Sequence, residues 1–150
     1  MKQIDRYNSK ILQELERNGR ISNTELAERI GLSPSACLRR VQELEKSGVI
    51  RGYRAILDSE RRGVGFIAYI TVGLSDHTLP AQESFEAAMR AAPEVRECHN
   101  TTGIVEYLLR VELQDISAYK VFHVEVFGAL PQVNSITTYV VLDSPKDERG

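Results

Sequence analysis

The sequence has no tryptophan, only two cysteines and two methionines among its 150 residues, and few aromatic residues (7%). Cys37 and Cys98 lie far apart, and neither belongs to a Cys-x-x-Cys pair or to a Cys/His cluster with zinc spacing. This cysteine usage argues against a disulfide framework, and we expect no metal site and no cofactor. It also makes the cytoplasm the expected compartment.

Long apolar runs are missing as well. No window reaches the roughly 18 to 20 apolar residues that a membrane span requires, and charged residues appear from the second position onward. We therefore predict neither a signal peptide nor a membrane partner. Hydrophobic residues make up 42% and charged residues 27%, which is typical of a folded globular chain with one domain or two small ones.

The net charge is small, −2, but it is unevenly distributed. Residues 1–62 hold 13 Lys and Arg against nine Asp and Glu, a net of +4, whereas residues 63–150 hold six against 12, a net of −6. A basic first part and an acidic second part fit a protein whose first part meets a polyanion such as nucleic acid. A difference of this size also arises by chance in short segments, so a motif has to decide.

Helical patterns fill the first third of the chain. Residues 5–18 place apolar side chains at helical spacing and end at an Asn-Gly pair. Residues 22–25 form a Ser-x-x-Glu capping box that opens a short helix, and this helix stops at Gly31. Ser33 and Pro34 start a third helix, with serine as N-cap and proline at the first helical position. Two helices joined by a glycine-containing turn indicate a helix-turn-helix, here at about residues 23–42.

The third helix divides into two faces. Cys37, Val41 and Leu44 recur at i, i+4 and i+7 and are predicted to pack inward. Arg39 and Arg40 are predicted to point away from this stripe, where arginine can bond guanine or phosphate in a major groove. A solvated face with two incidental arginines is the alternative. The candidate DNA-binding residues are Ser22, Asn23, Ser33, Ser35, Ala36, Arg39, Arg40 and Arg51.

Residues 63–142 predict the order β-α-β-β-α-β. We expect strands at 66–74, 95–102, 105–112 and 133–142, and helices at 80–92 and 115–130. This order is the ferredoxin-like arrangement, an antiparallel sheet with helices on one face. The predicted class is α+β, with a helix-turn-helix (winged-helix-like) domain at 1–52, a linker strand at 53–62, a ligand-sensing and oligomerisation domain at 63–142 and a tail at 143–150.

The sheet of this arrangement has a second face without helices. Apolar residues suggest that both faces are partly apolar, which predicts association of chains. The residues concerned are Ile67, Tyr69, Cys98, Leu108, Ile136 and Val140.

Motifs in both halves resemble the Lrp/AsnC (feast/famine) family of transcription regulators, and its leucine-responsive branch above all. The matching runs include 19–23, 31–34, 37–38, 52–53, 97–99, 107–109, 117–119, 130–131 and 138–141. The resemblance covers nearly all of residues 4–142. It implies a non-enzymatic, sequence-specific DNA-binding regulator of amino-acid-related metabolism. It further implies a homodimer, often assembled to an octamer, whose two recognition helices read half-sites of double-stranded DNA about 34 Å apart or multiples of that.

The resemblance also implies an effector site, taking a free amino acid at the loop 100–107. The carboxylate of Glu106 is the candidate acceptor for the ligand ammonium, and backbone N–H groups near Gly103 are candidate donors to its carboxylate. A β-turn with an exposed glutamate is the alternative. The candidate effector-binding residues are Asn100, Thr101, Thr102, Gly103, Ile104, Val105, Glu106, Thr137 and Tyr139.

One departure from the family bears on the effector. The family usually reads Gly-Asp-x-Asp-Tyr, whereas this chain has Gly-Ile-Val-Glu-Tyr at 103–107. An acidic residue is lost at Ile104, and the other is longer by one methylene at Glu106. The change predicts either a less polar pocket with altered specificity, which we favour, or loss of amino-acid binding.

Two other functions fit the same architecture. A siroheme-decarboxylase-like enzyme would need converging histidines or a tyrosine, but His77, His99 and His123 are spread over a loop, a strand and a helix. It would also have no need of a basic recognition helix. A ligand-independent architectural DNA-binding protein would more naturally be strongly positive, because phosphate neutralisation supplies non-specific affinity. The salt dependence of binding to operator and to random DNA separates this last alternative.

Overall fold

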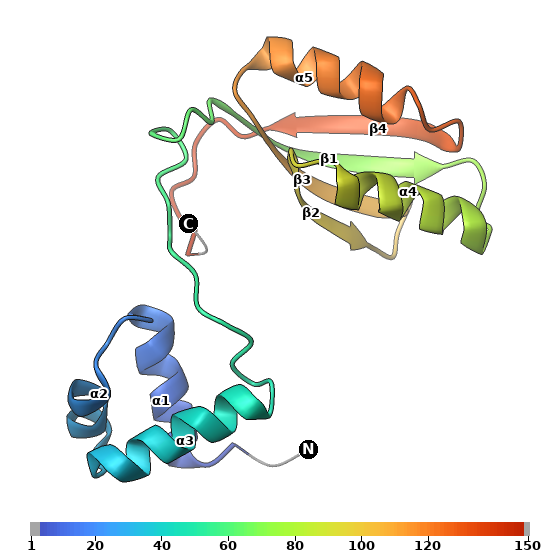
Figure 1. Ribbon diagram of the computed structural model, residues 1–150. Helices are drawn as coiled ribbons and strands as arrows, with labels where there is room; N and C mark the ends of the chain where they lie inside the picture. The colour runs from blue at the N-terminus through green and yellow to red at the C-terminus, as the bar shows by residue number, and fades with distance from the viewer. Residues whose placement is uncertain (1–3, 149–150) are drawn as a thin grey trace. The chain divides into compact units, whose positions relative to one another are not determined.

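The computed structural model describes residues 4–148 of the chain. The chain divides between Ala55 and Ile56 into two compact units. Figure 1 shows that the first unit is helical and that the second is built around a β-sheet. Among residues 4–148, no helix is long and apolar enough to cross a membrane.

Three helices form the first unit: α1 (Arg6–Arg17), α2 (Asn23–Ile30) and α3 (Pro34–Lys46). Each begins at a polar residue whose side chain accepts a hydrogen bond from a backbone N–H of the first turn: Asp5 from Asn8, Ser22 from Glu25 and Ser33 from Ala36. Gly31 ends α2 in the left-handed conformation, with φ of +76°. The three predicted helices, and the start signals predicted for the second and third, are thus confirmed.

The core of the first unit is small. Six buried residues make it up, contributed by all three helices: Ile11, Leu26, Ala27, Ile30, Cys37 and Leu44. Cys37 and Leu44 face inward as predicted, and Val41 packs against them while partly exposed. The thiol of Cys37 is buried, and its burial raises its pKa.

The linker strand expected at 53–62 is not a strand. Residues 51–58 have no helix or strand, and residues 59–63 form a turn in which the N–H of Gly63 donates to the carbonyl of Glu60. Loose alternation of apolar residues does not suffice, because a strand needs a partner to satisfy its backbone groups. Within residues 4–55 no strand forms either, so the likeness to a winged helix rests there on the helices.

The second unit has the predicted ferredoxin-like order. Its elements are β1 (Phe66–Leu74), α4 (Leu79–Ala91), β2 (Val95–Asn100), β3 (Tyr107–Leu113), α5 (Ile116–Phe122) with a π-helical turn (His123–Phe127), and β4 (Val133–Val140). The sheet order is β2-β3-β1-β4, and all three neighbouring pairs are antiparallel. The helix expected at 115–130 is therefore not uniform, because its backbone widens to a π turn after α5.

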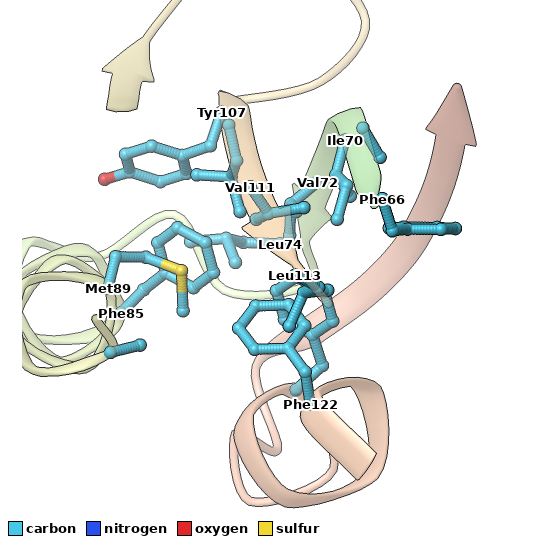
Figure 2. Packing of buried hydrophobic residues seen from close by; sticks show 14 residues of the cluster. Phe66, Ile70, Val72, Leu74, Phe85, Met89, Tyr107, Val111, Leu113 and Phe122 are labelled. Atoms are coloured by element: carbon cyan, nitrogen blue, oxygen red, sulfur yellow. The ribbon is translucent and has the colours of Figure 1, made fainter. Parts of the chain in front are cut away.

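Both helices of the second unit cover the same face of the sheet. Figure 2 shows Phe85 and Met89 of α4 and Phe122 of α5 packed against strand residues. The core contains 14 buried residues, and the ring of Phe85 lies 4.5 Å from that of Tyr107 between centroids. It is thus more than twice the size of the core in the first unit.

The face without helices differs from the prediction. Register places Cys98 opposite Leu109, Ile136 opposite Val72 and Val140 opposite Ala68, all on the face that the helices cover. Ile67, Tyr69 and Leu108 lie on the open face as expected. Arg110 and Glu112 lie there too and form an ion pair, and Arg110 is only 8% exposed. The open face is therefore partly apolar and carries a shielded ion pair.

Candidate DNA-binding helix and effector site

The start of α3 is fixed by hydrogen bonds from its own unit. Ser33 caps α3, and its Oγ also lies 3.4 Å from the Oγ of Ser35. The side chain of Asn23 donates a 2.8 Å hydrogen bond to the carbonyl of Pro34, which ties the start of α2 to the start of α3. Two of the predicted DNA-binding residues, Ser22 and Asn23, thus hold the helix-turn-helix geometry.

The two arginines of α3 have different surroundings. The side chain of Arg39 is 70% exposed and lies 3.5 Å from Glu43 on the next turn. Arg40 is 23% exposed, and its Nη1 donates to Asp5 at 2.7 Å and to Asn8 at 3.0 Å. The Arg40 guanidinium also lies 5.3 Å from the ring centre of Tyr7.

The predicted outward direction of Arg40 is therefore wrong, because this side chain folds back on the start of α1. It stabilises the carboxylate there: the pKa of Asp5 is lowered, first by the hydrogen bond from the N–H of Asn8 and then by the one from Arg40. Arg39 remains available to a ligand, as do Ser35 and Arg51, both exposed, and Ala36, which is partly exposed. Leu38, not singled out from the sequence, is 46% exposed on the same helix.

Glu106 is at the centre of the second candidate site, and its carboxylate is held on both sides. The N–H of Leu74 donates to Oε2 at 2.7 Å, and Nδ1 of His77 lies 2.9 Å from Oε1. The side chain of Glu106 is only 18% exposed, so it is not the exposed turn glutamate of the alternative interpretation.

Irregular pairing at the end of β1 makes this arrangement possible. The register of β1 with β4 shifts between Gly73 and Leu74. A Cβ on Gly73 would meet the Oγ of Ser135, which would have to move, and would lie 3.6 Å from Oε2 of Glu106, so the glycine gives this carboxylate a close approach to the strand. Gly73, Leu74 and His77 are not among the effector residues predicted from the sequence, although a lone glycine inside a strand pattern is a signal for a bulge.

The loop before Glu106 is closed by its own backbone. The N–H of Thr101 donates to the carbonyl of Glu106 at 2.8 Å, and the Oγ of Thr101 lies 3.4 Å from the carbonyl of Val105. Thr102, Gly103 and Ile104 are exposed at its tip.

Two predicted effector residues on β4 lie elsewhere on the sheet. On β1, Thr137 lies opposite Thr71 and Tyr139 lies opposite Tyr69, whereas the register of β3 places Glu106 beside Gly73. Gly73 and Tyr69 are four residues apart on β1, so Glu106 and Tyr139 are separated by about 14 Å along the strand direction. One chain therefore does not bring Tyr139 to the carboxylate.

A pocket of about 450 Å³ adjoins the loop on the helix side of the sheet edge. Its lining residues are Glu86, Met89, Arg90, Val95, Arg96, Glu97, Cys98, Asn100 and Tyr107. The buried hydroxyl of Tyr107 donates to Glu86 at 2.8 Å, and burial followed by this bond raises the pKa of Tyr107 to about 12. Burial likewise raises the pKa of Cys98 to about 11.

The three histidines have separate surroundings. His77 meets Glu106 in the segment between β1 and α4, and His99 on β2 meets Glu97 at 3.1 Å. The ring of His123 contacts the rings of Tyr119 and Phe127. The structure thus gives each histidine its own partners.

Comparison with protein families divides the chain in the same way. Residues 4–51 match the model of a winged helix-turn-helix DNA-binding domain, and residues 67–150 match that of the Lrp/AsnC ligand binding domain. The leucine-responsive regulatory proteins of Salmonella typhimurium and Escherichia coli K12 are 40% and 39% identical to it over 145 residues, covering 97% of this chain and 88% of theirs.

Solved structures agree. A transcriptional regulator of Neisseria meningitidis in complex with L-methionine superposes with a TM-score of 0.92 at 38% identity, covering 97% of this chain and 94% of that one. A feast or famine regulatory protein of Mycobacterium tuberculosis, also complexed with L-methionine, gives 0.88 at 28% identity, covering 99% and 98%. With its helix-turn-helix unit and its ligand-binding unit, the chain belongs to the Lrp/AsnC family of DNA-binding, ligand-modulated transcription regulators.

Proposed function

We propose that this regulator senses a free amino acid at the loop 100–107 of its second unit and thereby changes its affinity for operators of amino-acid-related genes. It acts by binding and not by catalysis, in the cytoplasm, where the chromosome lies. The observation that carries the effector proposal is the carboxylate of Glu106, fixed between Leu74 and His77 beside the loop. The L-methionine complexes of two relatives support the ligand class.

The chemistry of the loop suits a zwitterion. A carboxylate held in place by a backbone N–H is a preorganised acceptor for an ammonium group, and exposed loop N–H groups are donors for a carboxylate. Ile104 at the exposed tip replaces an acidic residue of the family pattern, so we expect the side-chain pocket to favour an aliphatic or thioether ligand over a polar one.

Association completes this proposal. Tyr139 and Glu106 are too far apart to share a ligand within one chain, so a site that uses both needs a second chain. The open face of the sheet, with Ile67, Tyr69 and Leu108 around the shielded Arg110–Glu112 pair, is the proposed dimer surface. Further assembly to an octamer is proposed by resemblance, and sedimentation equilibrium measures both steps.

The operator contacts are assigned to the exposed face at the start of α3. Arg39 is proposed to contact a base edge or a phosphate, together with Ser35 and Ala36 on the same helix. Arg51 is proposed to contact the phosphate backbone of the DNA. We expect Arg39→Ala to weaken operator binding by about 1–3 kcal/mol in a gel-shift titration without changing the melting temperature. Arg40→Ala should instead lower the melting temperature, since Arg40 holds Asp5. Unchanged operator affinity in Arg39→Ala would remove the assignment.

The effector is found by measuring thermal stability against the twenty amino acids at millimolar concentration. A ligand at about 100 times its dissociation constant stabilises the folded state by about 2.7 kcal/mol, which raises the melting temperature by several degrees. Glu106→Gln keeps the shape of the side chain and removes its charge, so it should lose the response while keeping operator affinity. A full response in Glu106→Gln would exclude the carboxylate as the acceptor, and silence of the unmodified protein across the panel would exclude an amino-acid effector.

A further inference from the structure

The carboxylate proposed to receive the effector already has a cationic or donor group of the chain beside it. His77 reaches Oε1 of Glu106 at 2.9 Å, while the opposite oxygen accepts from the backbone of Leu74. The backbone bond belongs to the bulge in β1 and is a fixed part of the sheet. The imidazole is different, because it stands in a segment outside any helix or strand and is 68% exposed.

The imidazole occupies the place that a ligand ammonium would take. An imidazole N–H and an ammonium group both donate hydrogen bonds to a carboxylate oxygen, at distances of about 2.7–3.1 Å. The N–H of Leu74 contacts one oxygen of the carboxylate, and the ring of His77 contacts the other. A ligand ammonium that approaches Oε1 of Glu106 therefore competes with His77 for this oxygen.

We propose that His77 is an affinity- and specificity-determining residue of the effector site: it holds Glu106 in the unliganded chain and is displaced by the ammonium group of the amino acid. The inference rests on the proposed effector site at Glu106. It adds that ligand binding releases the side chain of His77, in the segment 75–78 that joins β1 to α4. The backbone of this segment keeps other contacts: the N–H of Ser75 donates to the carbonyl of Gln132 at 2.8 Å, the N–H of Thr78 to Asp76 at 2.9 Å, and the side chain of Gln82 to the carbonyl of His77 at 3.2 Å.

The test is calorimetric titration of the full-length protein with L-methionine and L-leucine. His77→Ala should bind about tenfold more tightly than the unmodified protein, the size expected for losing one competing hydrogen bond to a charged group. His99→Ala is the matched control, because His99 also contacts a glutamate, Glu97, but away from this carboxylate. It should leave the affinity unchanged.

A second ligand separates displacement from a general loosening of the loop. The methionine analogue that lacks the amino group has no ammonium to compete with the ring, so any affinity it shows should be the same in His77→Ala and in the unmodified protein. Equal tightening for both ligands would overturn the displacement. Circular dichroism of His77→Ala verifies that the exposed substitution leaves the fold intact.

The outcomes also distinguish the two proposals. If the unmodified protein binds L-methionine or L-leucine and His77→Ala binds it equally or more weakly, His77 is not displaced, and the effector site at Glu106 stands. If Glu106→Gln binds as well as the unmodified protein, the site lies elsewhere and both proposals fall. If no amino acid binds to the unmodified protein or to His77→Ala, both fall as well.

Discussion

The two units of this regulator are stabilised in different ways. The first has six buried residues and relies on polar contacts between helices, such as Arg29 with Glu14 and Arg40 with Asp5. The second has 14 buried residues in one continuous core under a four-stranded sheet. A unit of about fifty residues buries little apolar surface, so its caps and ion pairs are a larger share of what holds it together.

This difference affects which polar residues remain available for function. In the first unit Asn23 and Arg40 hold the helices together, which leaves Arg39 as the exposed arginine of α3. In the second unit the apolar core holds the sheet, and the contact between Glu106 and His77 lies outside that core. A polar contact that the core does not need can rearrange when a ligand arrives.

The largest expected effect is in the core of the second unit. Phe85→Ala should lower the free energy of unfolding of that unit by about 3–5 kcal/mol, since Phe85 is fully buried and packs on Tyr107. Ile11→Val in the first unit should cost about 0.5–1.5 kcal/mol. Hydrogen exchange resolved by peptide assigns each loss to its unit. Equal loss of protection in both units would show that they unfold together.

An alkaline effect of about 2–3 kcal/mol is expected at Tyr107. Because burial raises the pKa of Tyr107 from its ordinary value of 10.0 to about 12 in the folded chain, only the unfolded chain loses this proton between pH 10 and 12. The contribution is complete below pH 10 and is lost as the pH rises to 12. Between pH 10 and 12, the free energy of unfolding should therefore fall less in Tyr107→Phe than in the unmodified protein, by about 2–3 kcal/mol. Both profiles are measured in a Cys98→Ser background, because the Cys98 thiol titrates in the same pH range and interacts with Tyr107. Parallel pH profiles would contradict the assignment.

The smallest effect is expected at a helix cap of the first unit. Ser22→Ala removes the acceptor for the N–H of Glu25 and should cost that unit about 1 kcal/mol in urea denaturation. Ser84→Ala, in the exposed middle of α4, is the control and should change stability by less than about 0.5 kcal/mol. An equal effect of the two substitutions would mean that the first unit does not depend on its caps.

Local signals predicted much of this architecture. The bounds of β1, Phe66–Leu74, follow from alternating apolar residues, and the start of α3 follows from Ser33 before Pro34, since both depend on near neighbours in the chain. The family motif also pointed to the carboxylate of Glu106. The direction of the Arg40 side chain could not be predicted from local signals, because its partners Asp5 and Asn8 lie more than 30 residues earlier in the chain.

Three helices, a β-α-β-β-α-β unit and membership of a family of regulators follow from the amino-acid sequence. Which side chains of these elements are exposed to a ligand follows from the way the elements pack. The strand register puts Cys98, Ile136 and Val140 on the face that the helices cover. The bulge at Gly73 and Leu74 brings Glu106 next to His77. Helix and strand periods are fixed by the local backbone, whereas register and long-range pairing depend on how whole elements pack, which single positions do not encode.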